Sequence, residues 1–185
     1  MTSHRTAGGV TFLAAYIGSI AVANWMTATF GLIPIGFGLA VTAGTFAAGA
    51  ALVLRDGVQT ELGKLWVLGA IVAGAALSFV TSTPAIAIAS TIAFLVSELV
   101  DFAVFTPLRG RSLPRAVLVS SVVSAPVDTV LFLTIAGFGV TWQAVLGQFI
   151  VKTALALVAA AWLTWRQTLV VPGAPRYMWI SRLAG

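Results

Sequence analysis

Long apolar stretches separated by short polar connections make up most of the chain. Runs of about twenty apolar residues recur at residues 9–30, 35–54, 65–83, 84–105, 116–138 and 142–165. A helix needs about 20 predominantly apolar residues to cross the hydrocarbon core of a bilayer. Each run is therefore predicted to be a transmembrane helix. The pattern as a whole predicts an all-α, polytopic six-helix bundle forming one membrane domain over residues 1–185.

Charged residues occur in alternate connections only. The connections near 31–34, 82–84 and 139–141 carry no charge, whereas those at 55–64 and 106–115 are rich in ionic groups. Nine of the ten basic residues fall in the N-terminal segment, these two connections and the tail: Arg5, Arg55, Lys64, Arg109, Arg111, Arg115, Arg166, Arg176 and Arg182. Because Lys and Arg accumulate in cytoplasmic loops, both termini are predicted to be cytoplasmic.

The second connection and the C-terminal tail are both expected to lie outside the hydrocarbon core. Arg55 and Asp56 are expected to belong to a solvated cytoplasmic loop, together with Glu61 and Lys64. Residues 166–185 contain aromatic and basic residues after a Pro-Gly-Ala-Pro turn and are expected to lie on the membrane surface as an interfacial tail.

Composition supports a membrane protein and excludes several other classes. Of 185 residues, 59% are hydrophobic and 8% are charged, whereas soluble domains carry about 25% charged residues. There is no cysteine and only one histidine, His4, so no metal site is expected. No P-loop, HExxH, GxSxG or GxGxxG motif is present. We therefore expect no enzyme activity, no catalytic residues and no cofactor. Nucleic acid is not an expected partner, because the basic groups of so apolar a chain mark its loops.

Ionisable residues inside the predicted helices are the candidates for a functional site. Each charge at the bilayer centre costs about 2.5–3.5 kcal/mol on insertion scales, and such residues commonly mark a substrate or ion path. Asp128 and Lys152 fall at the centres of the fifth and sixth runs, so an ion pair between them is expected. Glu98 and Asp101 lie three residues apart, which places both carboxyl groups on one helix face.

Structural roles remain open for several of these groups. The Asp128–Lys152 pair could have no role beyond fixing the helix register, and Asp101 could have none beyond neutralising Arg109. Asn24 could simply hydrogen-bond between helices.

A short internal echo links the fourth and fifth runs. Ser97 and Asp101, with their valine and phenylalanine neighbours, match Ser124 and Asp128 at an offset of 27 residues. In the predicted topology the two helices run antiparallel. Pro126 also interrupts the hydrogen-bond ladder of the fifth run, which membrane helices tolerate where they line a cavity or are buried in protein. These two helices are therefore the expected functional pair.

The fourth run also carries a family resemblance. Residues 89–105, containing Ser97-Glu98-Leu99-Val100-Asp101-Phe102 and followed by Leu108-Arg109, resemble the signature of the vitamin uptake transporter (VUT) family, the queuosine-precursor transporters of bacteria. The Ser/Asp segment of the fifth run, Lys152 in the last run, Asn24 in the first and Asp56 with Gly63 are similar to that family's pattern. The resemblance covers roughly residues 10–165.

The resemblance implies a function and a set of site residues. A transporter of the bacterial cytoplasmic (inner) membrane is implied, importing 7-cyano- or 7-aminomethyl-7-deazaguanine or the queuine base. Its partners would be this small-molecule base and membrane lipid. The residues expected to bind the base are Asn24, Phe94, Ser97, Glu98, Asp101, Ser124, Asp128, Gln148 and Lys152.

The energy source and the assembly of such a transporter stay open at this point. The buried carboxyl groups favour a proton-linked or facilitated carrier. The alternatives are a substrate-capture subunit for an energy-coupling-factor importer and a small proton or cation channel. A homo-oligomer and an energy-coupling partner are both compatible with the sequence.

Overall fold

The computed structural model describes the backbone of residues 2–169, and the side chains of residues 8–165 except residue 75. The greater part of the expected interfacial tail, including Arg176 and Arg182, lies outside the described residues.

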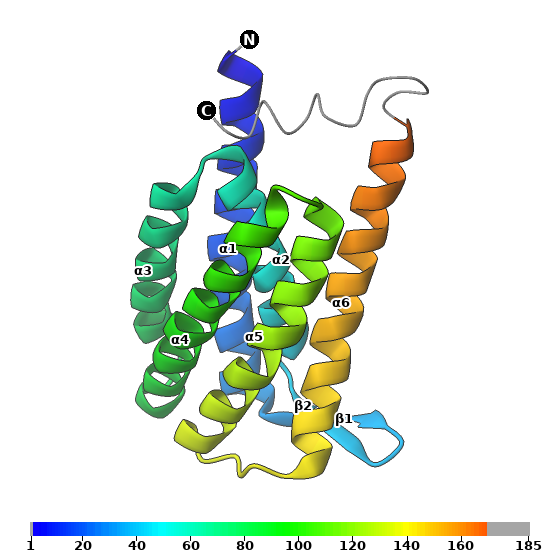
Figure 1. Ribbon diagram of the computed structural model, residues 1–185. Helices are drawn as coiled ribbons and strands as arrows, with labels where there is room; N and C mark the ends of the chain where they lie inside the picture. Colours follow the sequence, from blue (N-terminus) through cyan, green and yellow to red (C-terminus); the bar gives the residue numbers. More distant parts are fainter. Residues whose placement is uncertain (1, 170–185) are drawn as a thin grey trace.

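The described chain is a bundle of helices with one β-hairpin (Figure 1). Its elements are α1 (Thr2–Phe30), β1 (Leu32–Gly36), β2 (Leu39–Thr42), α2 (Thr45–Glu61), α3 (Lys64–Thr81), α4 (Pro84–Arg109), α5 (Leu113–Ile135) and α6 (Trp142–Leu169). Five helices of the described part, all except α2, are long and apolar enough to cross a membrane. The predicted all-α, polytopic fold class is therefore confirmed.

The prediction of a transmembrane helix over 35–54 is wrong. Residues 32–42 form an antiparallel hairpin, and α2 begins only at Thr45. The turn of the hairpin has positive φ at both central residues, 53° at Phe37 and 71° at Gly38, as two-residue turns between twisted strands require. The apolar run at 35–54 therefore contains most of the hairpin and the first part of α2.

The displaced start of α2 also corrects the interpretation of Arg55 and Asp56. Both were expected in a solvated loop, but they lie inside α2, where Arg55 is 0% and Asp56 2% exposed. With 17 residues, α2 is about 26 Å long, and these two residues fall on its inward side. They belong to the interior chemistry of the bundle.

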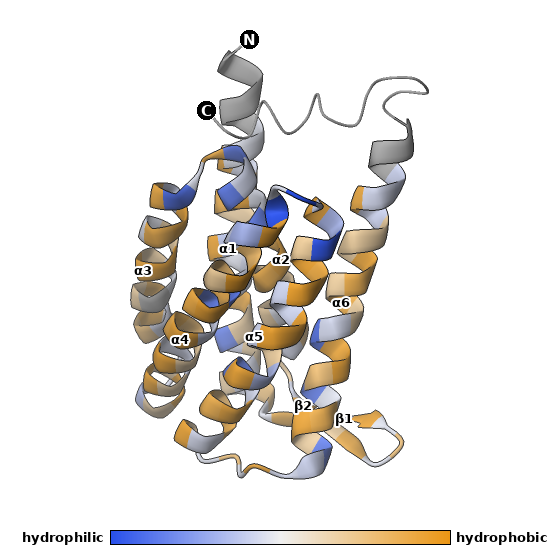
Figure 2. Ribbon diagram, viewed as in Figure 1, coloured by the Kyte–Doolittle hydropathy of each residue, from blue (hydrophilic) through white to orange (hydrophobic). Residues whose placement is uncertain are grey.

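The helices place the charged connections at one end of the bundle and the hairpin at the other. The α2–α3 and α4–α5 connections lie at the first end, and the hairpin lies with the α3–α4 and α5–α6 connections at the second (Figure 1). We call the second the hairpin end. Most residues of the helices between the two ends are hydrophobic (Figure 2), as expected of helices that contact lipid.

Close helix contacts position the interior side chains. A Cβ at Gly49 of α2 would lie 2.7 Å from Leu155 Cδ1 and 3.3 Å from Lys152 Cα on α6. A Cβ at Gly147 of α6 would lie 2.4 Å from the Ala40 carbonyl oxygen of the hairpin. Glycine at these two positions therefore allows α2 and the hairpin to pack tightly against α6, beside Lys152.

Candidate functional site

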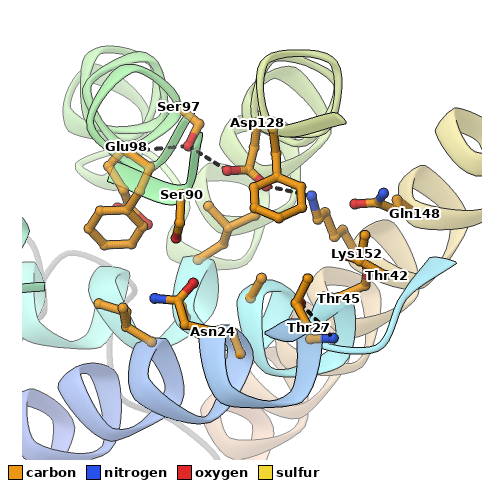
Figure 3. Close-up of a pocket in the computed structure, with 18 residues that line it drawn as sticks. Asn24, Thr27, Thr42, Thr45, Ser90, Ser97, Glu98, Asp128, Gln148 and Lys152 are labelled. Atoms are coloured by element: carbon orange, nitrogen blue, oxygen red, sulfur yellow. Dashed lines mark hydrogen bonds and ion pairs between the residues drawn. The ribbon is translucent and has the colours of Figure 1, made fainter. Parts of the chain in front are cut away.

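A polar cavity lies between α1, α2, α4, α5 and α6 in the half of the bundle nearest the hairpin end (Figure 3). Its volume is about 50 Å³, on the scale of a few water molecules. Its polar lining residues are Asn24, Thr27, Thr42, Thr45, Ser90, Ser97, Glu98, Asp128, Gln148 and Lys152. So many polar groups in an otherwise apolar bundle favour a binding site for a polar ligand.

The ion pair expected from the sequence forms one wall of the cavity. Lys152 Nζ lies 2.5 Å from Asp128 Oδ2 and donates a further hydrogen bond of 2.9 Å to the Thr129 hydroxyl. The other carboxylate oxygen, Asp128 Oδ1, accepts a 3.2 Å hydrogen bond from the Ser97 hydroxyl. Lys152 is 1% exposed and Asp128 18%. Both oxygens of Asp128 are therefore held, while the carboxyl group still reaches the cavity.

Two other lining residues have buried polar atoms without hydrogen-bond partners. Both carboxyl oxygens of Glu98 and the amide nitrogen Nε2 of Gln148 have none among the described residues. Glu98 is 0% and Gln148 2% exposed. Leaving a buried donor or acceptor unsatisfied costs about 1–3 kcal/mol. Such atoms in the wall of a cavity point to a ligand that supplies the missing partners.

A second ionic cluster, the Arg55 cluster, lies next to the cavity on its side away from the hairpin. It consists of Arg55, Asp56, Glu98 and Asp101, all 0–2% exposed. Arg55 Nη1 donates to Asp56 Oδ1 at 2.7 Å and to Asp101 Oδ2 at 2.9 Å. Arg55 Nε lies 3.3 Å from Glu98 Oε2, an ion pair without a hydrogen bond.

Aromatic rings complete the surroundings of this arginine. Its guanidinium carbon lies 5.2 Å from the centroid of the Phe102 ring and 5.6 Å from that of Phe105. Cation–π contacts at such distances add to the stabilisation of a desolvated guanidinium. Asp101 neutralises Arg55 and not Arg109, which donates to the Gln59 carbonyl oxygen instead. The alternative that paired Asp101 with Arg109 is wrong.

The sequence echo of α4 and α5 corresponds to reciprocal contacts. The Ser97 hydroxyl of α4 donates to Asp128 of α5 at 3.2 Å, and the Ser124 hydroxyl of α5 donates to Asp101 of α4 at 3.1 Å. Each aspartate also binds a cation from a flanking helix, Arg55 of α2 or Lys152 of α6. The repeated Ser and Asp residues therefore form two similar units, related by exchange of the antiparallel helices.

Asn24 combines an interhelical and a cavity position. Its side-chain amide donates to the Ser78 hydroxyl of α3 at 2.8 Å, and that hydroxyl lies 3.5 Å from the hydroxyl of Ser90 on α4. Figure 3 shows Asn24 on the wall opposite Ser90 and Glu98. The structural hydrogen bond expected as an alternative is present, and the residue nonetheless lines the cavity.

The structure brings most of the expected binding residues to the cavity. Seven of them line it: Asn24, Phe94, Ser97, Glu98, Asp128, Gln148 and Lys152. Asp101 and Ser124 do not line it, because their hydrogen bonds direct them to the Arg55 cluster.

Sequence reasoning did not identify every polar group at the site. Thr27 lies near the end of α1, Thr42 and Thr45 lie in the stretch 35–54 that was expected to be one helix, and Arg55 was assigned to a loop. The glycines Gly36 and Gly38 are a hairpin signal, and they could have moved the start of the second helix, and with it Arg55, inward.

Comparison with known proteins identifies the family. The chain matches the family described as "Putative vitamin uptake transporter" over residues 6–166. No curated protein and no solved structure matches. The match covers most of the 185 residues, so the chain belongs to the vitamin uptake transporter family and is a multi-pass membrane protein of a transporter family.

Proposed function

Because the chain belongs to a transporter family, we propose that it imports a queuosine precursor across the bacterial cytoplasmic membrane. The substrate class is a 7-deazaguanine: the 7-cyano or 7-aminomethyl compound, or the queuine base. The base binds in the cavity between α1, α2, α4, α5 and α6. The chain acts as a secondary or proton-linked carrier and not as an enzyme, and both its termini are cytoplasmic.

The observation that carries this proposal is the pair of unsatisfied groups in the cavity. Glu98 offers two carboxyl oxygens and Gln148 offers an amide N–H, all buried and without a hydrogen-bond partner among the described residues. A guanine-like base has N–H donors beside a ring carbonyl, and these supply both kinds of missing partner. A site built in this way rejects ligands that lack the edge, because its buried polar groups then remain unpaired.

The other lining residues suit a flat, polar ring. Phe94 and Phe132 are the aromatic side chains of the lining, and either ring can pack against a base. Asp128 pairs with Lys152 at the wall of the cavity, and a carboxylate in this position can accept N–H bonds from the ligand. A cavity of about 50 Å³ is narrow for a bicyclic base, so binding requires its walls to separate, as alternating access provides.

Replacing Asp128 with Asn tests the proposal. Asp128→Asn removes the negative charge of the carboxyl group that contacts both Lys152 and, in this proposal, the base. The substitution is expected to abolish uptake of labelled 7-cyano-7-deazaguanine while leaving membrane insertion intact. Uptake is measured in proteoliposomes with and without a pH gradient. Glu61→Gln is the matched control, since it changes an exposed carboxyl group to an amide outside the cavity, and it should transport normally. Uptake by well-expressed Asp128→Asn at the wild-type rate would refute the assignment.

The same reconstitution separates the carrier from its alternatives. A carrier takes up base with no other protein in the membrane, whereas a substrate-capture subunit binds base but transports it only with an ATPase that co-purifies from cells. A small proton or cation channel conducts ions in the absence of base. Lipid is the expected surrounding partner, nucleic acid is not, and sizing in detergent reports whether the carrier is a homo-oligomer.

A further inference from the structure

The buried ionic groups of the bundle do not balance in charge. Arg55 and Lys152 are the two buried cations among the described residues, and Asp56, Glu98, Asp101 and Asp128 are acids in contact with them. Lys152 matches Asp128 one to one. The Arg55 cluster therefore has three carboxyl groups for one guanidinium, an excess of two negative charges if all are ionised.

Glu98 is the acid that the cluster holds least firmly. Both hydrogens of Arg55 Nη1 are used by Asp56 and Asp101. Glu98 faces Arg55 Nε at 3.3 Å without a hydrogen bond, and neither of its oxygens has a hydrogen-bond partner among the described residues. Of the three acids, it alone lines the cavity. Its carboxyl group can therefore contact a ligand in the cavity while it still contacts the cluster.

Titratable groups on four helices lie around Glu98. Tyr16 of α1 lies close to it but its hydroxyl makes no hydrogen bond in this conformation. Arg55 and Asp56 face it from α2, Asp101 from its own helix, Asp128 from α5, and Lys152 of α6 is engaged by Asp128. Residues 65–81 of α3 contain no titratable side chain. The one cation in contact with Glu98 is thus shared with two closer acids.

A proton fits this site better than a metal cation does. Among the described residues, no three acids converge in a way that could hold a metal ion. Hard cations such as Ca²⁺ need six or more oxygen ligands, whereas a proton needs one oxygen. Burial in a medium of low polarity disfavours an ionised acid that lacks a hydrogen-bonded partner.

We propose that Glu98 carries the proton that is co-transported with the base, one proton for each base molecule. The proposal rests on the proposed function, since it names the coupling group of the same cavity. In its neutral form Glu98 presents an O–H donor beside a carbonyl acceptor. That pair complements the ring carbonyl and adjacent N–H of a guanine-like base, so the proton and the base bind together.

The neighbouring acids divide the remaining roles. Asp128, held by Lys152, is a hydrogen-bond acceptor in the wall of the cavity. Asp56 and Asp101 are closed off from the cavity around Arg55 and do not exchange their protons during transport. When the base leaves on the opposite side of the membrane, Glu98 releases its proton there and returns to Arg55 as a carboxylate.

The test measures proton movement and base uptake in the same proteoliposomes. The purified chain is reconstituted with a trapped pH-sensitive dye, and neutral, labelled 7-cyano-7-deazaguanine is added outside. Wild-type uptake should acidify the interior by one proton per base and be faster with an inside-negative potential. At equilibrium, the ratio of base inside to base outside should rise about tenfold for each pH unit by which the outside is more acidic. One pH unit is a tenfold ratio of proton concentrations, and one proton moves with each base. Replacing Na⁺ by choline should change nothing.

Glu98→Gln isolates the coupling group, with Glu61→Gln as the matched control. An amide keeps a donor and an acceptor in the place of those of a neutral carboxylic acid but cannot release a proton, so Glu98→Gln should lose proton coupling whatever its affinity for the base. Its transport should neither acidify the interior nor respond to the pH gradient. Glu61→Gln should behave as the wild type in both respects.

The outcomes separate this inference from the proposed function. Wild-type uptake without acidification, uptake that depends on Na⁺, or acidification by Glu98→Gln each overturns the role of Glu98 and leaves the substrate assignment intact. The first two measurements use the wild type alone, so they decide the matter even if Glu98→Gln fails to fold. Absence of base binding and uptake by the wild type overturns both proposals.

Discussion

The two ionic centres of the bundle use the same local unit in different surroundings. In each, an aspartate of α4 or α5 accepts a hydrogen bond from a serine of the other helix and pairs with a cation from a flanking helix. The Arg55 centre is sealed around Asp101, which is 0% exposed and does not line the cavity, whereas Asp128 of the Lys152 centre is 18% exposed and lines it.

The choice of cation agrees with this difference. The planar guanidinium of Arg55 faces three carboxyl groups through two nitrogens, Nη1 and Nε, and packs near two phenylalanine rings. An ammonium group has a single nitrogen for all such contacts. The ammonium of Lys152 is a compact charge on a flexible stem, held by one carboxylate and one hydroxyl. Arg55 thus has more partners than Lys152, whose carboxylate also lines the cavity.

The largest expected effect comes from removing the arginine. Arg55→Met leaves three buried carboxyl groups without their cation, and breaking a buried ion pair in this way costs about 3–5 kcal/mol. We expect a large loss of thermal stability in detergent and low expression. Arg111→Met, at an exposed position, is the control and should leave the melting temperature unchanged. An Arg55→Met protein as stable as the control would show that the cluster is not a structural centre.

Removing the lysine should affect transport more than stability. Lys152→Met leaves Asp128 without its cation, but this carboxyl group is partly exposed to the cavity and can be hydrated there. We expect a smaller drop in melting temperature than for Arg55→Met and a decrease in base uptake of about tenfold or more, corresponding to at least ~1.4 kcal/mol.

A double variant sharpens this prediction. Lys152→Met combined with Asp128→Asn removes both charges, and replacing both partners of a buried pair is often nearly neutral for stability. The double variant should therefore recover the melting temperature but not uptake. Recovery of uptake together with stability would mean that the pair serves the fold alone.

The sequence predicts the apolar framework and the polar residues of four helices well, for a physical reason. A bilayer imposes a minimum length on apolar helices, and it makes each buried charge, such as Asp128 or Lys152, conspicuous against its neighbours. The ion pair between these two residues follows from their equal depth on helices joined by a short connection, and the structure confirms it.

The sequence is less informative where apolar residues serve two kinds of structure. Hydropathy does not distinguish the hairpin around Phe37 from a helix, because both are apolar. That single misassignment shifted Arg55 from the interior to a loop, so its ion pair with Asp101 could not be foreseen. Depth along a helix follows from its start, and an error at the start is passed to every later residue.

The smallest expected effect compares the two serines of the repeated unit. Ser97→Ala removes a hydrogen bond from Asp128 in the cavity wall, and Ser124→Ala removes one from Asp101 in the Arg55 cluster. Each change should cost about 1 kcal/mol, but the cost should appear in different measurements.

Ser97→Ala should weaken base binding about five-fold with little change in melting temperature, because the freed carboxylate oxygen can be hydrated from the cavity. Ser124→Ala should lower the melting temperature by a few degrees and leave binding unchanged, since Asp101 is 0% exposed and does not line the cavity. Equilibrium binding of labelled base and thermal unfolding, applied to both variants, check this. Equal effects of the two substitutions on both measurements would mean that the repeated units do not differ in role, and that the distinction between a sealed and an open centre has no functional content.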